Sequence, residues 1–293
     1  MMHDVRDYKT VPISYKESFA VSFLYNCLPG RVLLKLLVRP SISKIVGHIL
    51  DSSASRILIR GFIKRNNIKM EEYQAVRYKS FNAFFIREIN KGYRPFPKHE
   101  FDLAAPCDGK LTAYPISEDS IFRIKNSIYT IESLLCNKAL AAGYCGGVCL
   151  FFRLTPDDHH RYAYIDDGKI LYHKRIKGVL HTVRPISQIM YNVFAQNTRE
   201  YEVIKTKNFG KVVQMEVGAL FVGYITNLNT KTEFKRGDEK GMFEFGGSTV
   251  IMLFQKDNVT IDKAILENTQ QEKETIVRMG LKIGEKTIKG YNI

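Results

Sequence analysis

The stretch that most strongly determines the fold is residues 246–254, which read GGSTVIMLF. The paired glycines predict a tight turn, and the apolar run that follows is typical of a short buried strand. Similar runs rich in Val, Ile, Tyr and Phe occur at residues 147–154, 211–217 and 219–228, and glycine, asparagine or aspartate separates them. From about residue 101 onward, this pattern predicts a mainly β domain, either a barrel or a sandwich of short strands.

The N-terminal part of the chain has a different pattern. Between residues 18 and 73, apolar residues recur at helical spacing, for example at residues 32–37 and 42–49. Pro40 separates these two runs, and Ser41 is a candidate cap for the second. The sequence therefore predicts an α+β protein in which a helical region, residues 1–75, packs on a β domain, residues 76–293.

Basic residues punctuate the predicted helices at short intervals. They are Arg31, Lys35, Arg39, Lys44, Arg56, Arg60, Lys64 and Arg65. One interpretation is a helical subdomain that packs on the core and exposes a solvated basic face. The other is a surface lying in a membrane interface, where apolar side chains enter the acyl boundary and the cations meet anionic headgroups. The pattern itself does not choose between them.

Composition narrows the classes of partner and compartment. The formal net charge of +14 predicts a polyanionic partner, which could be nucleic acid, an anionic membrane or an acidic substrate. No secretory signal pattern and no run long enough for a spanning helix is found in the sequence. The five cysteines form no CxxC pair, which indicates a reduced, cytosolic compartment without a zinc or redox site.

Three short motifs contain residues suited to catalysis. A glycine before Ser248 leaves the preceding carbonyl open to attack by the serine hydroxyl, which is the first step of self-cleavage to a pyruvoyl group. That attack needs a base and a carboxylate to orient it. Asp108, in a Pro-Cys-Asp-Gly turn, can supply the carboxylate, and the adjacent His159 and His160 are candidates for acid–base work. Each motif alone is more often a plain turn or a solvated loop.

Taken together, the motifs resemble those of the phosphatidylserine decarboxylase family, the pyruvoyl-dependent enzymes of phospholipid synthesis. The matching stretches, in chain order, are SFNAFFIR with Arg94-Pro95, PCDG, LTPDDHHR, FAQNTRE, VGA through Val222-Gly223, and GGSTV. Each is weakly specific alone, but their shared order across roughly residues 30–290 is highly specific.

The resemblance implies a role for each matching position. Ser248 becomes the pyruvoyl cofactor after cleavage between Gly247 and Ser248, which gives a β chain of residues 1–247 and an α chain of residues 248–293. Asp108 belongs to the self-processing triad, and His160 serves the decarboxylation step. The second histidine of the family's His-Arg-x-His signature, the usual triad base, is replaced here by Ala163.

We hypothesise that His181 supplies the missing base, because the small Ala163 leaves room for its imidazole. His160 is another candidate for this base, and a processing-dead homologue is the alternative. His159 and His173 are expected to be solvated or structural.

The resemblance further implies decarboxylation of phosphatidylserine to phosphatidylethanolamine, with no metal required. We expect peripheral binding at the cytoplasmic face of the cell membrane, with phosphatidylserine in an anionic bilayer as the partner. A homodimer is left open. The rival hypotheses are an uncleaved lipid-binding pseudoenzyme and, from charge alone, a basic nucleic-acid-binding protein, although no nucleic-acid motif is found.

Overall fold

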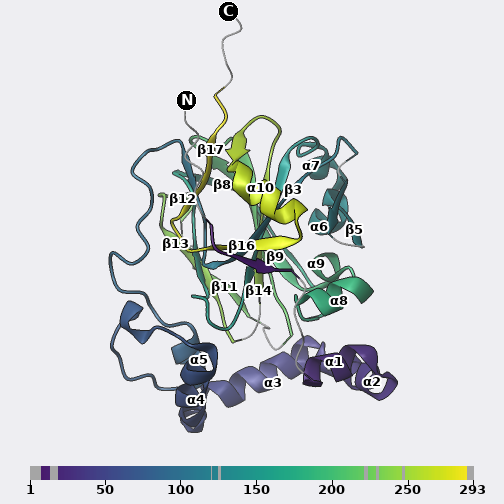
Figure 1. Cartoon of the computed structure of the whole chain (residues 1–293), viewed down its shortest axis with the longest axis vertical. Coiled ribbons are helices and arrows are strands. Elements are labelled where there is room, and N and C mark those ends of the chain that lie inside the picture. Colours follow the sequence, from purple (N-terminus) through teal and green to yellow (C-terminus); the bar gives the residue numbers. More distant parts are fainter. Residues whose placement is uncertain are drawn as a thin grey trace, which may run out of the picture.

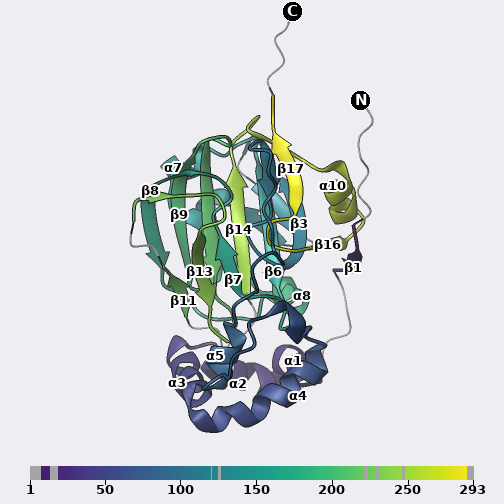
Figure 2. The same cartoon turned by 90° about the vertical axis from the view of Figure 1, so that its left-hand side faces the viewer.

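A computed structural model describes residues 8–13, 19–119, 121–124, 127–220, 224–228, 231–245 and 248–288 of the chain. The helices of the N-terminal part gather at one end, and antiparallel sheets with further short helices beside them form the rest (Figures 1 and 2). The α+β class predicted from the sequence is confirmed.

The described residues form one large sheet of nine strands, and every pairing within it is antiparallel. In spatial order, its strands are β1 (Thr10–Pro12), β16 (Lys273–Val277), β3 (Gly109–Pro115), β6 (Val148–Leu154), β14 (Ser248–Phe254), β10 (Lys211–Val217), β9 (Arg199–Thr206), β8 (Gly168–Ile176) and β12 (Glu233–Phe234). Among the described strands, the order ends at β1 and β12, so this sheet does not close into a barrel.

Smaller sheets accompany the large one. They are formed by β11 (Ile225–Asn227), β13 (Glu239–Phe243) and β7 (Arg161–Ala163), by β15 (Val259–Ile261), β17 (Lys282–Lys286) and β2 (Asp102–Ala104), and by β4 (Ile121–Ile124) with β5 (Ser127–Thr130). One apolar core joins the large sheet to both three-stranded sheets and to α10 (Lys263–Gln270), through side chains such as Phe152, Val250 and Phe243. A second core, which includes Phe151 and Ile251, lies beneath α6 (Ile131–Leu135), α7 (Lys138–Ala142) and α9 (Val193–Gln196). Because neighbouring residues of a strand point to opposite faces, β14 contributes alternately to both cores.

The predicted N-terminal helices are present. They are α1 (Phe19–Asn26), α2 (Leu28–Leu37), α3 (Pro40–Asp51), the 3₁₀ turn η1 (Ser53–Arg56) and α4 (Ile57–Asn66). Pro40 is the first residue of α3, where its missing N–H costs no hydrogen bond. The cap position is therefore Arg39, and the expectation that Ser41 caps this helix was wrong.

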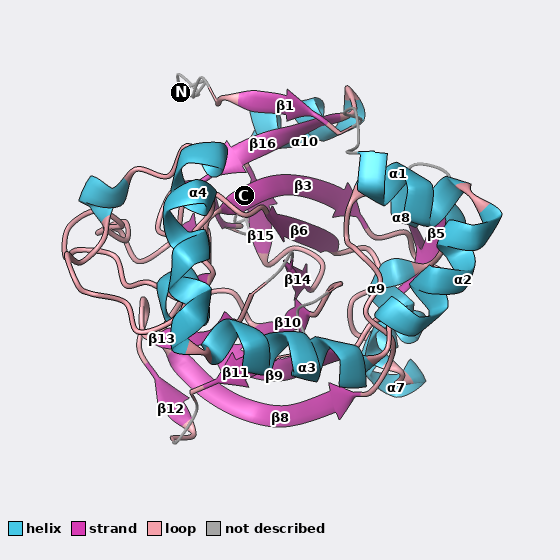
Figure 3. Cartoon of the chain, turned by 90° about the horizontal axis from the view of Figure 1, so that it is seen from below, coloured by secondary structure: helices cyan, strands magenta, loops and turns pink. Residues whose placement is uncertain are grey.

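The helices lie across one end of the sheets, as the view along the long axis shows (Figure 3). α3, α4, the turn η2 (Met70–Glu72) and α5 (Phe81–Phe85) share a core that includes Phe84. α1 and α2 pack around Tyr25 and Leu34, next to α8 (Pro185–Met190). Among the described residues, no single helix is long and apolar enough to cross a membrane; α1 and α2 meet the criteria only as a pair, which is bent by 98°.

Candidate active site

Ser248 is the first residue of β14. This start of the strand lies at the helical end of the large sheet, because the preceding Phe245 packs against Phe81 and Phe85 of α5. Figure 2 shows β14 standing above the helices. The side chain is fully buried, and its hydroxyl has no hydrogen-bond partner among the described residues. Gly246 and Gly247, which complete the proposed cleavage motif, lie outside the described residues. A buried hydroxyl without a partner is costly in a folded protein, and a catalytic role is one of the reasons for which such a group is retained.

Strand register brings Asp108 to the same end of the sheet as Ser248. On β6, Arg153 pairs with Lys110 on one side and with Thr249 on the other. Asp108 and Ser248 therefore lie at matching ends of the two strands that flank β6. With strands spaced at ~4.8 Å, their backbones are roughly 10 Å apart.

A bidentate ion pair fixes the Asp108 carboxylate. Arg94 donates from Nε to Oδ1 at 2.8 Å and from Nη2 to Oδ2 at 2.7 Å, and the Met279 backbone N–H donates to Oδ1 at 2.8 Å. Burial alone would raise the pKa of Asp108, but the hydrogen bonds and charge of Arg94 outweigh it and lower that pKa below the usual range. The carboxylate is therefore ionised and oriented.

His160 lies beside the segment that leads into Ser248. Its backbone carbonyl accepts a hydrogen bond from Phe243 N–H at 2.9 Å, and its ring lies 4.2 Å from that of Phe85, which in turn lies 5.2 Å from Phe245. Nδ1 is 3.0 Å from the carbonyl oxygen of Asp158. Because a carbonyl only accepts, Nδ1 carries the proton, and Nε2 is left with a free lone pair and no partner among the described residues.

His159 has the opposite tautomer. Its Nε2 lies 3.1 Å from the Arg87 carbonyl oxygen and must donate to it, so Nδ1 carries the free lone pair. Burial lowers the pKa of His159 to about 3, and the nearby Asp108 carboxylate opposes that shift. His159 was expected to be solvated or structural; its side chain is buried, which excludes the solvated alternative and leaves the structural one. His173 is about half exposed beside Glu200.

Burial also lowers the pKa of His160 to about 3, and the positive charge of Arg87 acts in the same direction. Both adjacent histidines are therefore neutral near pH 7. A neutral imidazole with an unoccupied nitrogen can accept a proton, and this is the property that serine activation requires.

His181 lies in the segment between β8 and α8, and its contacts are aromatic. Its ring stacks on that of Tyr191 at 4.2 Å, and its Nδ1 lies 3.3 Å from the hydroxyl of Tyr25. Asn197 binds the backbone N–H and carbonyl of His181 and also the carbonyl of Gly218, which follows β10. Burial lowers the pKa of His181. The hydrogen bonds of Asp108 are with Arg94 and Met279, not with this histidine.

Two arginines that support the site were quoted in the sequence motifs but given no role. Arg94 orients Asp108, as described above. Arg87 is buried and donates to the carbonyl of Asp158 at 3.1 Å and to the hydroxyl of Tyr73 at 3.3 Å. It thereby holds the loop that carries both histidines. An arginine inside an otherwise apolar motif was the available signal, because a buried guanidinium must have partners.

Position 163, where the family's second histidine is replaced, lies close in space to the Pro-Cys-Asp-Gly turn that carries Asp108. The N–H of buried Ala163 donates to the carbonyl of Pro106 at 2.8 Å. A cavity of about 250 Å³ reaches this region and is lined by residues that include Arg94, His159 and Met279.

Within the described residues, no group of three or more His, Cys, Asp and Glu side chains could hold a metal ion.

Comparison with known proteins places these features in a family context. A family model described as phosphatidylserine decarboxylase matches residues 81–285. The chain is 48% identical over 266 residues to phosphatidylserine decarboxylase proenzyme 2 of Clostridium acetobutylicum, covering 90% of this chain and 91% of that protein. It is 40% identical over 272 residues to the phosphatidylserine decarboxylase proenzyme of Clostridium novyi, covering 91% and 92% of the two chains. The proenzyme of Fusobacterium nucleatum is 38% identical over 271 residues, with 90% of each chain covered.

Proposed function

Since the chain belongs to the phosphatidylserine decarboxylase family, we propose that it converts phosphatidylserine to phosphatidylethanolamine with a pyruvoyl group made from its own Ser248. The observation that carries the proposal is the buried, unpartnered Ser248 hydroxyl at the same sheet end as the ionised Asp108 and two neutral histidines.

Self-processing begins with removal of the Ser248 proton by a neutral imidazole. The hydroxyl oxygen attacks the carbonyl carbon of Gly247 and replaces the peptide nitrogen, so an ester forms while the amine is released. Loss of the α-proton from residue 248 then cleaves the ester, frees the Gly247 carboxylate and leaves a dehydroalanine. Hydrolysis of the dehydroalanine releases ammonia. The resulting pyruvoyl group supplies a carbonyl that takes up the electron pair released as CO₂ leaves the substrate.

Three histidines are candidates for the processing base: His181, His159 and His160. His181 is the base that the sequence predicts, and its segment is tied through Asn197 to Gly218 at the end of β10, the strand next to β14. The geometry also favours His159, because its free Nδ1 and the influence of Asp108 on its pKa are what an oriented base needs. We keep His181 as the sequence-based proposal and treat His159 as its competitor.

His160 is proposed to act in the decarboxylation step. Its free Nε2 and its place beside Phe85 and the segment leading into Ser248 suit a group that holds or delivers a proton at the substrate α-carbon.

We propose that residues 1–75 form a membrane-associating region and residues 76–293 the catalytic domain, built as a layered sandwich. Exposed apolar side chains on the helical end include Phe19, Leu28 and Ile57. Together with the basic residues of the same helices, they support peripheral binding to an anionic bilayer at the cytoplasmic face. After cleavage, the β chain of residues 1–247 and the α chain of residues 248–293 stay together through the pairing of β14 with β6 and β10. A homodimer is compatible with this arrangement.

Mass spectrometry of the purified protein tests the proposal. We expect two fragments without added protease, the smaller one starting at position 248 and blocked by pyruvoyl. Ser248→Ala should stay a single chain and bind lipid without turning it over. An uncleaved wild-type chain would instead support the lipid-binding pseudoenzyme, and cleavage of Ser248→Ala at the same bond would rule out Ser248 as the attacking group.

Three single histidine variants separate the roles. If His181 is the base, His181→Ala should block or strongly slow cleavage while His159→Ala is processed normally. The opposite pattern would assign the base to His159. In either case, His160→Ala should be cleaved but should fail to decarboxylate, and an uncleaved His160→Ala would move the processing base to His160.

A further inference from the structure

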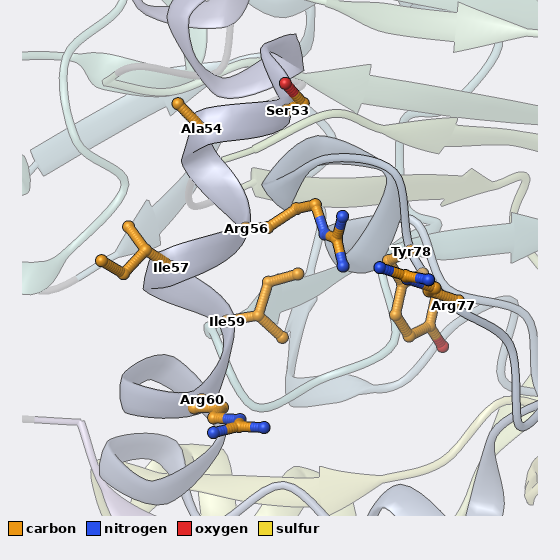
Figure 4. A pocket seen from close by; sticks show the side chains of 8 residues that line it. All are labelled: Ser53, Ala54, Arg56, Ile57, Ile59, Arg60, Arg77 and Tyr78. Atoms are coloured by element: carbon orange, nitrogen blue, oxygen red, sulfur yellow. The ribbon is translucent and has the colours of Figure 1, made fainter.

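A cavity of about 460 Å³ lies between α4, η1 and residues 77–78, at the helical end of the molecule. Its lining includes three arginines, Arg56, Arg60 and Arg77, together with Tyr78 and Ile57. Arg56 and Arg60 extend from one side of the helical segment toward Arg77 and Tyr78, while Ile57 points to the opposite side (Figure 4). The volume falls in the range of ~300–1,000 Å³ that is typical of small-ligand sites.

The three guanidinium groups have no carboxylate partner among the described residues, in contrast to several arginines around the catalytic site. Arg94, Arg153 and Arg161, for example, each form ion pairs with acidic side chains. Three cations that share one cavity repel each other, and a bound anion removes that cost. Arginine is well suited to such an anion, because its planar fork matches the oxygens of a phosphate group.

The surroundings of the cavity indicate where its ligand comes from. Exposed apolar side chains lie next to the arginines along the chain: Ile57 is 85% exposed, Leu58 is 49% exposed and Val76 is 53% exposed. Cations interleaved with exposed apolar side chains match the boundary of a bilayer, where headgroup phosphates lie just above the acyl chains. A soluble metabolite would have no need of this apolar rim.

The cavity also adjoins others that lead toward the catalytic histidines. A second cavity, of about 370 Å³, shares Arg77 and Tyr78 with the first and extends to Arg87 and Arg161. The cavity beside His159 in turn shares Arg161 with the second. The arginine cluster therefore lies at the membrane end of a row of cavities that reaches the site.

We infer that Arg56, Arg60 and Arg77 bind the phosphate of an anionic phospholipid in the bilayer, at a site separate from the one where the serine headgroup reacts. The inference rests on the membrane association proposed above. Occupation of this site would hold the helical end on the bilayer, with the row of cavities opening at the level of the headgroups.

The test is binding of the full-length protein to vesicles of phosphatidylcholine with phosphatidylglycerol, or with oleate at the same surface potential. Wild type should prefer the phosphatidylglycerol vesicles, because oleate carries its charge without a phosphate and the phosphate of phosphatidylcholine is neutralised by its own choline cation. Each cation near an anionic bilayer strengthens binding by roughly fivefold, so the triple variant R56Q/R60Q/R77Q should bind these vesicles roughly 100-fold more weakly. The triple variant R56K/R60K/R77K keeps the charge and should lose the preference for phosphatidylglycerol over oleate.

The matched control removes three charges from exposed lysines on other elements, Lys138, Lys169 and Lys211, as K138Q/K169Q/K211Q. Lys211 begins β10 at the end opposite the pairing of Val217 with Thr249, so it lies away from the Ser248 end of the sheet. This control should bind like wild type. A control as weak as R56Q/R60Q/R77Q, or an R56K/R60K/R77K variant that keeps the lipid preference, would overturn the site in favour of general charge attraction.

Two further measurements distinguish a lipid phosphate from a soluble one and test the decarboxylase activity separately from the phosphate site. Glycerol 3-phosphate, measured by calorimetry, should bind weakly; tight binding without any preference among vesicles would identify a soluble phosphate ligand and overturn the lipid assignment. Turnover of soluble short-chain phosphatidylserine by wild type tests the decarboxylase separately. If wild type does not turn over this substrate but still prefers phosphatidylglycerol vesicles through the three arginines, the proposed function is refuted and the phosphate site is supported.

Discussion

Arg94 offers the sharpest test of how the site holds Asp108. Its side chain is 4% exposed, and it donates two hydrogen bonds to Asp108, at 2.8 and 2.7 Å, and one to Glu72 at 2.9 Å. Arg94→Met removes the charge and keeps an unbranched apolar side chain in its place. Glu72 retains Arg278, but Asp108 becomes a buried carboxylate without its cation.

The expected cost follows from the two lost bonds. A hydrogen bond to a charged group contributes ~1.5–3 kcal/mol, and removal of one partner of a buried ion pair costs ~3–5 kcal/mol. We expect Arg94→Met to lower the free energy of unfolding by about 3–5 kcal/mol. At ~2 °C per kcal/mol for a chain of this size, the Tm should fall by roughly 6–10 °C.

Arg278→Met is the matched control. Arg278 pairs with Glu72 at 2.7 Å, its side chain is 52% exposed, and Glu72 keeps Arg94 when it is removed. Exposed pairs of this kind contribute ~0–1 kcal/mol. Both substitutions are best compared by thermal unfolding in a Ser248→Ala background, where the chain stays uncleaved. Equal Tm values for the two variants would refute the assignment of Arg94 as the counter-ion that holds Asp108.

The same pair of variants predicts a change in pH dependence. Because Arg94 lowers the pKa of Asp108, the carboxylate stabilises the fold above its ordinary pKa, and this contribution is lost as the pH falls through the lowered value. In Arg94→Met, the arginine no longer opposes the effect of burial, so the pKa of Asp108 rises. If self-cleavage needs ionised Asp108, its rate in Arg94→Met should increase between ~pH 5 and 8. The rates of wild type and Arg278→Met should change less over this range, because Asp108 is already ionised in both. Identical pH profiles would contradict the role of Arg94.

Two further predictions concern the membrane surface and the buried charges. Binding to anionic vesicles should weaken as salt is raised from low to physiological strength, because screening acts on exposed charges; retention on the membrane after a carbonate wash would contradict peripheral binding. Lys240 pairs with Glu216 at 2.7 Å, both are fully buried, and burial raises the pKa of Glu216 to about 7, so stability should decline as the pH rises through about 7. Lys240→Met should lower the free energy of unfolding by about 3–5 kcal/mol. It should also extend that decline to higher pH, because loss of the cation raises the pKa of Glu216 further, and a Tm within error of wild type at pH 8 would contradict it.

Much of the fold could be predicted from local patterns in the sequence. The run predicted at residues 211–217 is β10, and the strand predicted to follow Gly246 and Gly247 is β14, whose first residue is Ser248. The turn predicted at the two glycines lies outside the described residues. Such strands are buried on both faces, so their continuous apolar composition is visible in the sequence. The run predicted at residues 219–228 yields only β11, Ile225–Asn227, among its described residues.

The closure of the sheet could not be predicted in the same way. A barrel and a sandwich are built from the same short alternating strands, and only the order in which strands pair distinguishes them. That order follows from contacts between segments far apart in sequence, such as β1 with β16 near the opposite end of the chain. Local pattern contains no information on such pairings.

The roles of the histidines likewise could not be predicted from local sequence, because they depend on contacts with distant residues. The family resemblance assigned position 163 to the base; because Ala163 stands there, the prediction turned to His181, whose imidazole could fill the vacated space. The structure adds the partner of each ring nitrogen: the Arg87 carbonyl fixes the tautomer of His159 and leaves its Nδ1 with a free lone pair, whereas the Tyr25 hydroxyl, which can donate or accept, lies against Nδ1 of His181. A backbone carbonyl supplied by a residue 72 positions earlier leaves no local trace in the sequence. What a histidine can do is therefore set by the partner of its other nitrogen, which is why three variants, and not the motif, must identify the base.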